Sequence, residues 1–504
     1  MRKRDWTIIT FIFFVGFYLR VMFLPGNTLT FGYDQARDAL VTQQILAGDF
    51  KILGPPASTP GLYHGVFYYY FLAPAYLFGR NPVNVAYWAA LFNAATVFVV
   101  AALTYLMTKK RLAAFLAAFL FALSFEAIQY ATWLSNPTIG IWTVPLFYLG
   151  LWLWVDRSRN KFGMTFGPVL TALGLGVSIQ AEIFLAYHIV PLIIWLVYSK
   201  RVVTKKQLAS FILVLGLVLS TMLLVEFKFG FKGLSGLQAL AISHQPLAYA
   251  KSLGDYLVLY LNQIGRIFAF NSYPGNIGYG GAFVIVLTLL GLRRERQKWG
   301  PFLATWLFSH LTVVTVGGTS TPFLMVGIGP AVSILLAIWI SRWWGNNKLV
   351  AASLVAVLVF GNLSMIMREN KRGSTLFAIQ PDMLLSKQLA AIDYTYEKAG
   401  KEPFSVNTLT SPLDINIVWS YLYKWYGQEK YGYIPEYHGR DQIGQLDALS
   451  ARSPDTSNFF LILEPMGGIP VQHLELKLGE ENVGTKVVDE VYWGELRVQE
   501  RTKI

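Results

Sequence analysis

Residues 83–126 read VNVAYWAALFNAATVFVVAALTYLMTKKRLAAFLAAFLFALSFE, and this stretch decides the fold class. It contains two apolar runs, 83–107 and 112–126, on either side of a Lys-Lys-Arg hinge at 109–111. A helix needs about 20 consecutive apolar residues to cross the hydrocarbon core of a bilayer. The stretch is therefore typical of two membrane-spanning helices joined by a short basic turn.

The rest of the chain repeats this pattern. Of the 504 residues, 54% are hydrophobic and only 14% are charged, whereas soluble domains carry roughly 25% charged residues. We therefore expect a polytopic α-helical membrane protein with about eleven transmembrane helices. The predicted spans are 6–24, 83–107, 112–126, 138–155, 163–180, 183–199, 207–226, 279–292, 300–316, 322–340 and 349–366.

Basic residues gather in the hinges on one side of this eleven-span arrangement. These hinges carry 19 Lys and Arg against 3 acids, whereas the opposite side carries 8 against 7 up to residue 366. The positive-inside rule then places the N-terminus in the cytoplasm and the C-terminus outside. The predicted location is the plasma membrane, with the outer loops 25–82 and 227–278 and the tail 370–504 all extracytoplasmic. The hinges are 2–4, 109–111, 157–161, 200–206, 293–298 and 342–348.

The tail differs in composition from the membrane part. Residues 371–504 hold 14 Lys and Arg against 18 Asp and Glu, whereas residues 1–370 hold 28 against 11. The basic excess therefore belongs to the membrane part, which argues for lipid topology and against nucleic-acid binding. We divide the chain into a transmembrane module, 1–369, and a small α/β domain, 370–504. Its expected elements are helices at 382–399 and 414–426 and strands at 404–409, 459–463 and 487–499.

One apolar segment does not fit the count of spans. Residues 64–79 are apolar enough for a short span, but counting them would move the hinge at 109–111 to the outer side. We therefore expect 64–79 to be re-entrant or interfacial, packed at the outer surface of the membrane.

Acidic residues on the outer side are few, and ionisable groups at the membrane surface deserve a functional reading. Motifs for nucleotide hydrolysis or zinc proteolysis are absent, and there is no cysteine. Acid–base chemistry outside the tail must therefore use Asp34, Asp38, Asp49, Glu126, Glu182, Glu226 or Asp255.

Asp34 and Asp38 stand out in the stretch FGYDQARDALV at 31–41. If 34–47 is helical, the two carboxylates share a face at i,i+4 with Arg37 beside them. A catalytic pair is one interpretation. The other interpretation is that Asp34 caps the helix and Asp38 pairs with Arg37 or Arg20.

A second charged cluster is EFKFGFK at 226–232, at the outer end of a predicted span. Lys228 and Lys232 are cations at the bilayer surface and suit a phosphate headgroup. Interfacial snorkelling by lysine is the simpler reading of the same pattern. His64 is a candidate donor or ligand, and Glu126 and Glu182 either face the same outer cavity as Asp34 or end their helices.

Three stretches resemble the GT-C glycosyltransferases, in particular prokaryotic relatives of the protein O-mannosyltransferases and the aminoarabinose transferase. They are GYDQARDA at 32–39, HGVFYYYFLAP with a following FG at 64–79, and LVEFKFGF at 224–231. The chain also resembles that family in its general plan, which has an acidic motif soon after the first helix, an odd number of spans and an outer C-terminal domain. The resemblance covers roughly residues 1–370 and implies a GT-C-like fold.

The resemblance also implies a mechanism. A sugar on a polyprenyl phosphate would be transferred, with inversion, to an extracytoplasmic acceptor that is a lipid, a glycan or a protein. Asp34 matches the catalytic base, with Asp38 as a second acid four residues on. The resemblance implies that Arg37, Lys228 and Lys232 hold the donor phosphate. The residues expected in the substrate and acceptor cavity are Tyr33, His64, Tyr69, Glu126, Glu182 and Glu226.

The sequence leaves alternatives open for the cofactor and for the class of function. No metal site is predicted, although a divalent ion on Asp34 with Glu126 or Glu182 stays open. A surface-polysaccharide polymerase or ligase would also act on polyprenyl-linked glycans. A transporter of lipid-linked glycans is disfavoured, because the spans carry almost no mid-membrane charge. We also expect the tail to cover the first outer loop or to present the acceptor.

Overall fold

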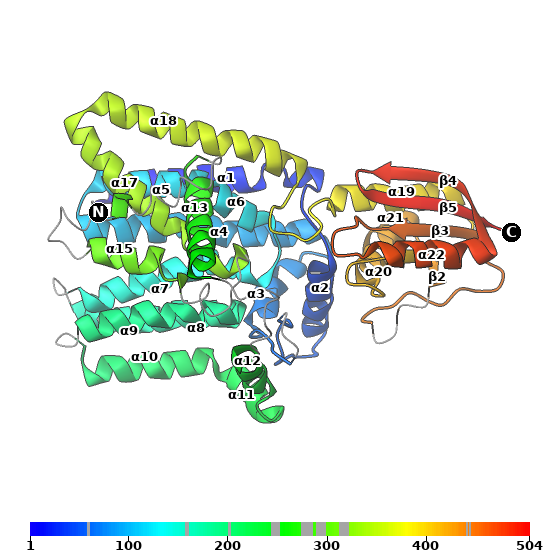
Figure 1. Cartoon of the computed structure of the whole chain (residues 1–504), viewed down its shortest axis with the longest axis horizontal. Coiled ribbons are helices and arrows are strands. Elements are labelled where there is room, and N and C mark those ends of the chain that lie inside the picture. Colours follow the sequence, from blue (N-terminus) through cyan, green and yellow to red (C-terminus); the bar gives the residue numbers. More distant parts are fainter. Residues whose placement is uncertain are drawn as a thin grey trace.

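The computed structural model describes residues 1–57, 61–156, 161–199, 203–242, 252–273, 286–288, 299–311, 322–439, 442 and 445–504. Helices occupy the predicted spans that lie in these ranges, and most run along the long axis of the molecule (Figure 1). The predicted span 279–292, apart from 286–288, and the hinge 293–298 lie outside the described residues. The helices are α1 (Lys3–Val21), α4 (Pro82–Thr108), α5 (Arg111–Leu123), α6 (Phe125–Thr132), α7 (Gly140–Val155), α8 (Lys161–Ala181), α9 (Ile189–Tyr198), α10 (Lys205–Val218), α11 (Ser220–Lys228), α15 (Trp299–Leu307), α17 (Gly329–Asn346) and α18 (Lys348–Met365).

Four helical segments among the described residues are long and apolar enough to cross a bilayer by themselves. Two bent pairs raise the number to six, because α5 and α6 meet at 49° and α10 and α11 meet at 57°. Two further apolar stretches, Thr165–Ala181 and Ile183–Tyr198, are shorter. Eleven crossings therefore stay a prediction. The four segments are Lys3–Gly26, Pro82–Thr108, Asn136–Val155 and Lys348–Asn370.

Two contacts bring predicted cytoplasmic hinges together. Arg111 Nε lies 3.2 Å from the Asp5 carboxylate, which joins the hinge at 109–111 to the N-terminus. The Arg342 guanidinium lies 5.2 Å from the ring centroid of Trp299, directly after the hinge at 293–298. The N-terminus and the tail lie at opposite ends of the helical module (Figure 1). Both contacts therefore join segments on the side that we predict to be cytoplasmic, and the N-in, C-out orientation stays a prediction.

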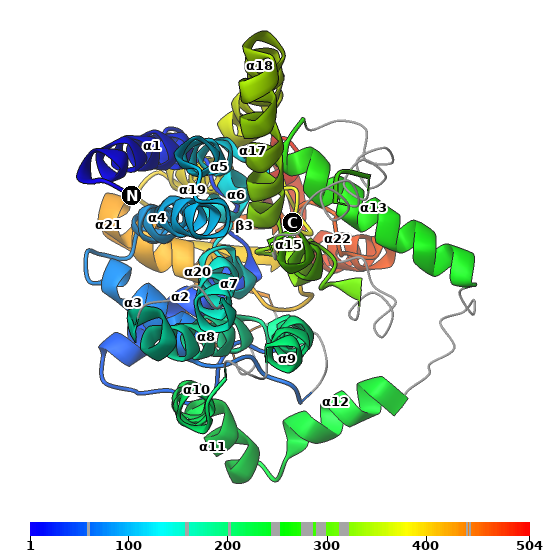
Figure 2. The same ribbon diagram turned by 90° about the vertical axis from the view of Figure 1, so that its left-hand side faces the viewer.

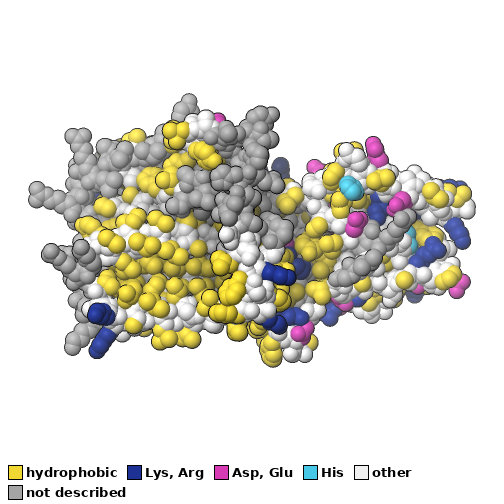
Figure 3. Space-filling view, turned by 60° about the horizontal axis from the view of Figure 1, so that its bottom comes forward, with side chains coloured by type: hydrophobic (Ala, Val, Ile, Leu, Met, Phe, Trp, Pro, Cys, Tyr) yellow, Lys and Arg dark blue, Asp and Glu magenta, His cyan; other side chains and the backbone are white. Residues whose placement is uncertain are grey.

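Small residues allow the closest helix packing in the module. A Cβ at Gly150 of α7 would lie 2.4 Å from the backbone nitrogen of Thr171 in α8. A Cβ at Gly174 of α8 would lie 2.4 Å from the backbone nitrogen of Phe147. Helices in membranes gain much of their association energy from such close backbone approach. Figure 3 shows hydrophobic side chains over much of the described surface of the module, as a lipid-facing surface requires.

The first outer loop contains two short helices, α2 (Tyr33–Leu46) and α3 (Phe67–Tyr76). Because α3 has ten residues, it is too short to cross a bilayer, where about 20 are needed. It packs in one buried cluster with α2. The expectation that 64–79 does not span the membrane agrees with this geometry.

The bend between α10 and α11 is joined to the first loop by one side chain. Gln180, at the end of α8, donates through Nε2 to the Val218 carbonyl (2.6 Å) and to the Thr221 hydroxyl (2.9 Å). Its Oε1 accepts from the Phe67 backbone N–H at 3.4 Å. The Val218 carbonyl, at the bend, therefore has a hydrogen-bond donor. A helix broken within a membrane requires such a partner for its backbone groups.

The second outer loop contains helices that the sequence analysis did not predict. They are α12 (Lys232–Ile242) and α13 (Leu253–Asn271). Helix α13 carries an apolar face with Ile264 and Ile267 in the main core. In Figure 2, α10, α11 and α12 lie away from α13, on the opposite side of the described module.

The tail is a five-stranded sheet with helices, as predicted. The strand order is β2-β1-β3-β5-β4, and β1 pairs in parallel with β2 and β3, whereas β5 is antiparallel to β3 and β4. The predicted strand 404–409 coincides with β1, whereas α22 and β2 were missed. The elements are α19 (Leu385–Ala399), β1 (Phe404–Leu409), α20 (Ile417–Leu422), α21 (Gln428–Tyr431), β2 (Glu436–Tyr437), β3 (Asn458–Leu463), α22 (Val471–Gly484), β4 (Thr485–Trp493) and β5 (Leu496–Lys503).

Candidate functional site

Helix α2 lies between the helical module and the tail (Figure 1). It begins after Gly32, whose backbone N–H donates to the Gln35 side chain at 2.9 Å, and this contact ties the first turn together. Asp34 therefore lies in the first turn of α2 and does not cap the helix. In the first turn a carboxylate also interacts favourably with the helix dipole. Gln35 then donates to the Leu134 carbonyl at 2.8 Å, which attaches α2 to the module.

Arg37 joins both predicted catalytic carboxylates. Its Nη1 donates to Asp34 Oδ1 at 2.6 Å, and its Nη2 and Nε donate to Asp38 Oδ1 at 2.6 and 2.8 Å. Asp34 and Asp38 therefore share a face with Arg37, as expected, and the pairing of Asp38 with Arg37 is also what the non-catalytic alternative predicts. The predicted alternative partner, Arg20, is not involved, because it donates to Asn93 and to backbone carbonyls of α1 and α5.

The two carboxylates differ sharply in exposure. The Asp34 side chain is 57% exposed, whereas that of Asp38 is 2% exposed. Burial raises the pKa of Asp38 to about 7 despite the opposing charge of Arg37. Asp38 Oδ2 is also buried without a hydrogen-bond partner among the described residues. Asp34 can therefore meet a substrate from outside, while Asp38 holds Arg37 from within.

Aromatic and histidine side chains surround Arg37. The guanidinium carbon lies 5.4 Å from the ring centroid of Tyr33, and Tyr69 contacts the same guanidinium. His64 Nδ1 accepts from the Ile183 backbone N–H at 3.2 Å. Burial, with the nearby charge of Arg37, lowers the pKa of His64 to about 4, so the ring is neutral near pH 7. His64 therefore joins the first loop to the turn after α8, with Glu182 3.7 Å from the same nitrogen.

Glu126 belongs to a different cluster from Asp34. The Asn271 amide, at the end of α13, donates to the Glu126 carboxylate at 2.6 Å. Arg266, one turn earlier in α13, lies close enough for its charge to act on Glu126. The Nε and Nη2 atoms of Arg266 are buried without a hydrogen-bond partner among the described residues. The sequence analysis missed Arg266, although a lone arginine in the apolar stretch 253–271 is a signal that could have identified it.

The second predicted cluster is exposed. Lys228 lies at the end of α11 with its ammonium 5.6 Å from the ring centroid of Phe229, and Lys232 begins α12 on the surface. Glu226 accepts from the Leu234 backbone N–H at 3.0 Å and so supports the start of α12. A Cβ at Gly61 would lie 3.8 Å from the Lys232 carbonyl, so this segment reaches the first outer loop.

The carboxylates of the site have partners other than a metal. Arg37 forms ion pairs with Asp34 and Asp38, Asn271 binds Glu126, and Glu182 accepts from the Phe184 backbone N–H at 3.4 Å. Across the described ranges, no three His, Asp or Glu side chains are grouped as a metal site requires. The alternative metal site on Asp34 with Glu126 or Glu182 is therefore not assembled in this structure.

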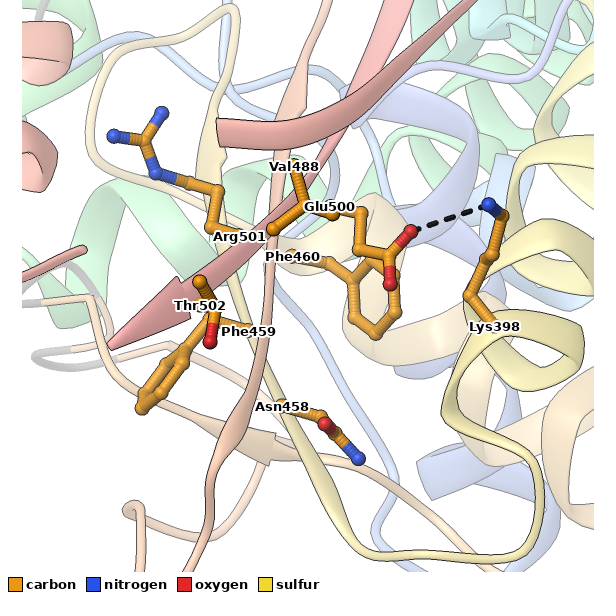
Figure 4. Close-up of a pocket in the computed structure, with 8 residues that line it drawn as sticks. All are labelled: Lys398, Asn458, Phe459, Phe460, Val488, Glu500, Arg501 and Thr502. Carbon is orange, nitrogen blue, oxygen red and sulfur yellow. Dashed lines mark ion pairs between the residues drawn. The ribbon is translucent and has the colours of Figure 1, made fainter. Parts of the chain in front are cut away.

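A hollow in the tail lies apart from these residues. It has a volume of about 250 Å³ and lies beside β3 and β5, between Phe460 and Lys398 of α19 (Figure 4). Glu500 pairs with Lys398 across it at 3.3 Å. All the residues that line the hollow belong to the tail, and none of them belongs to the carboxylate site on α2.

Comparison with known proteins places the fold. No protein-family model and no curated protein sequence matches the chain. The crystal structure of ArnT from Cupriavidus metallidurans bound to undecaprenyl phosphate superposes with a TM-score of 0.62 at 11% identity, over 99% of this chain and 98% of that one. Its apo form gives a TM-score of 0.60 at 11% identity, over 98% and 97%.

A more distant match is the oligosaccharyltransferase of Archaeoglobus fulgidus, at a TM-score of 0.46 and 12% identity over 86% of this chain and 64% of that one. ArnT is an aminoarabinose transferase, and both neighbours are membrane glycosyltransferases of the GT-C superfamily. The superposition on ArnT shows that the chain has the ArnT-like GT-C fold over nearly its whole length, whereas the resemblance in the sequence predicts that fold for roughly residues 1–370.

Proposed function

We propose that this protein is a membrane glycosyltransferase that moves a sugar from a polyprenyl-phosphate donor to an extracytoplasmic acceptor, with Asp34 as the general base. The observation that carries the proposal is the exposed Asp34 carboxylate, held 2.6 Å from the buried Arg37 on a helix at the end of the module. The ArnT structure with undecaprenyl phosphate supports the class of donor, since it shares this fold over both whole chains.

The chemistry uses the residues in distinct roles. Asp34 takes the proton from the acceptor hydroxyl, whose oxygen attacks the anomeric carbon as the bond to the phosphate oxygen breaks. The configuration inverts because attack and departure occur on opposite faces of the sugar. Arg37 holds Asp34 in place, and Asp38 holds Arg37. A base must lie within hydrogen-bond reach of the proton it removes, and Asp34 is the accessible carboxylate of the pair.

The departing lipid phosphate needs cations. Lys228 and Lys232 stand on the segment that reaches the first outer loop, and Arg266 has two buried donor nitrogens without partners among the described residues. Arg37 stays a candidate, although its three nitrogens already donate to Asp34 and Asp38. Preorganised cations at a developing negative charge stabilise the transition state. Tyr33, His64, Tyr69 and Glu182 surround Arg37 or the adjoining turn and are proposed to line the substrate cavity.

The experiment measures sugar transfer by the purified protein from the lipids that co-purify with it. Mass spectrometry of these lipids identifies the donor, and labelled donor then reports transfer. We expect Asp34→Asn to fold and to bind donor but to lose transfer by about a hundredfold or more, the usual contribution of a general base. Asp49→Asn is the matched control, because Asp49 is another exposed acid of the same loop, paired with Lys51. Full activity of Asp34→Asn would exclude Asp34 as the base.

A further inference from the structure

The tail touches the catalytic helix at both of its ends. Before α2, residues 29–31 pair antiparallel with residues 383–385, which lead into α19. The Phe31 N–H donates to the Met383 carbonyl and the Leu385 N–H donates to the Leu29 carbonyl, each at 2.9 Å. These bonds lie within five residues of Asp34, so the tail and the start of α2 form one backbone unit.

Gln388 of α19 adds a third bond at the same place. Its side chain is fully buried, and its Nε2 donates to the Phe31 carbonyl at 2.6 Å. Phe31 precedes the first residue of α2 by two positions. The same Nε2 also donates to the Met383 sulfur at 3.8 Å. The buried amide therefore holds the backbone just before the first turn of α2, three residues from Asp34.

Tyr421 of α20 touches the other end of α2. Its ring lies 5.5 Å from the ring of Phe31, and its hydroxyl accepts from the Gln43 side chain at 3.3 Å. The same hydroxyl donates to the Arg80 carbonyl, at the end of the first outer loop. One buried tyrosine of the tail therefore contacts the start of α2, its last turns and the loop that precedes α4.

We propose that the tail is a fixed support for α2, in which Gln388 and Tyr421 are positioning residues for Asp34 and Arg37. This assignment rests on the proposed function of Asp34. It differs from a mobile cover and from an acceptor platform, because neither of these needs buried bonds to the backbone at the base of the catalytic helix. Apolar side chains of α2, α3, α19 and α20 also share one continuous core, as a fixed junction requires.

The first test is a reversible crosslink. Thr30 and Leu384 are antiparallel partners between the two backbone bonds, a non-hydrogen-bonded pair whose Cα atoms lie about 4.5 Å apart, within disulfide range. The chain has no cysteine, so Thr30→Cys with Leu384→Cys forms the only disulfide. We expect the oxidised variant to keep transfer within about twofold of its reduced form. A loss that reductant restores would show that the tail moves during turnover, and failure to crosslink would contradict the junction itself; either result overturns the proposal.

The second test separates positioning from acceptor binding. We expect Gln388→Ala and Tyr421→Phe to lower kcat about tenfold or more, since small misplacement of a catalytic group is costly, with the acceptor KM unchanged. Tyr426→Phe is the matched control, because its hydroxyl bonds Asp393 within the tail and does not contact α2. A raised acceptor KM with kcat unchanged would make the tail an acceptor platform and would overturn the assignment.

A third measurement does not depend on activity. Hydrogen exchange of residues 33–46 should speed up in Gln388→Ala and stay at the wild-type rate in Tyr426→Phe. Unchanged exchange in Gln388→Ala would refute the support of α2 even if transfer falls. If exchange is faster in Gln388→Ala but the wild-type protein transfers no sugar, the proposed function is refuted, whereas the support of α2 by the tail still holds.

Discussion

Residues 33–46 and 220–242 carry similar charged patterns with opposite outcomes. Both place two like-charged residues four apart, Asp34 with Asp38 and Lys228 with Lys232, at the outer end of the module. In the first segment a buried arginine joins the pair, and α2 has partners on both sides. In the second segment both lysines are exposed. Similar spacing therefore yields an ordered site only where neighbouring elements cover the helix.

The largest effect should come from Arg37. Removing one partner of a buried ion pair typically costs about 3–5 kcal/mol, and Arg37→Gln leaves Asp38 buried without its counter-charge. We expect Arg37→Gln to abolish transfer and to lower the thermal unfolding temperature. The double variant Arg37→Gln with Asp38→Asn removes both charges. It should regain stability without regaining transfer, as a melting curve and an activity assay on the same sample will show. If the double variant regains both stability and transfer, Arg37 has only a structural role.

The lysine pair should give an intermediate effect. Surface cations near lipid headgroups contribute about 1 kcal/mol each, so Lys228→Gln with Lys232→Gln should weaken apparent donor affinity by roughly thirtyfold. High salt should produce a similar loss in the wild type, because exposed charges are screened. Titration of labelled donor lipid measures both. Unchanged affinity would leave Arg266 and Arg37 as the remaining cations for the phosphate.

The smallest effect concerns pH. Burial raises the pKa of Asp38 to about 7, so as pH falls through that value the carboxyl gains a proton and its ion pair with Arg37 weakens. We expect the transfer rate of the wild type to fall a few-fold on the acid side of about pH 7. Asp38→Asn should have a lower rate throughout and should lack this acid limb, which pH–rate profiles will test. An identical limb in Asp38→Asn would assign the titration to another group.

Local patterns predicted the parts of the molecule that depend on local sequence. The apolar runs, the helix at 34–47 and the strand at 404–409 follow from periodicity over a few residues. The pairing of Arg37 with Asp34 follows from the i,i+3 spacing on one helix, whereas Arg37 and Asp38 are neighbours in sequence. The helical conformation of α2 and the charges on one of its faces could therefore be predicted from the sequence alone.

Contacts between distant segments could not be predicted in this way. Glu126 binds Asn271, which lies 145 residues away in the sequence. Arg266 gains its importance only because α13 turns it toward Glu126. Gln388 and Tyr421 looked like ordinary residues of an amphipathic tail helix, and nothing local indicates that they contact α2. Tertiary packing decides each of these partners.

The side chain of Gln180 has a consequence for how the protein responds to its lipid surroundings. The same amide bonds the bend between α10 and α11 and the start of α3. A helix longer or shorter than the local hydrocarbon thickness adjusts by tilting or bending, and a bent helix adjusts most easily at its bend. If α10 and α11 together cross the bilayer, we expect a thicker or thinner bilayer to act on the first outer loop through Gln180. Transfer measured in lipids of different chain length should vary in the wild type and vary less in Gln180→Ala.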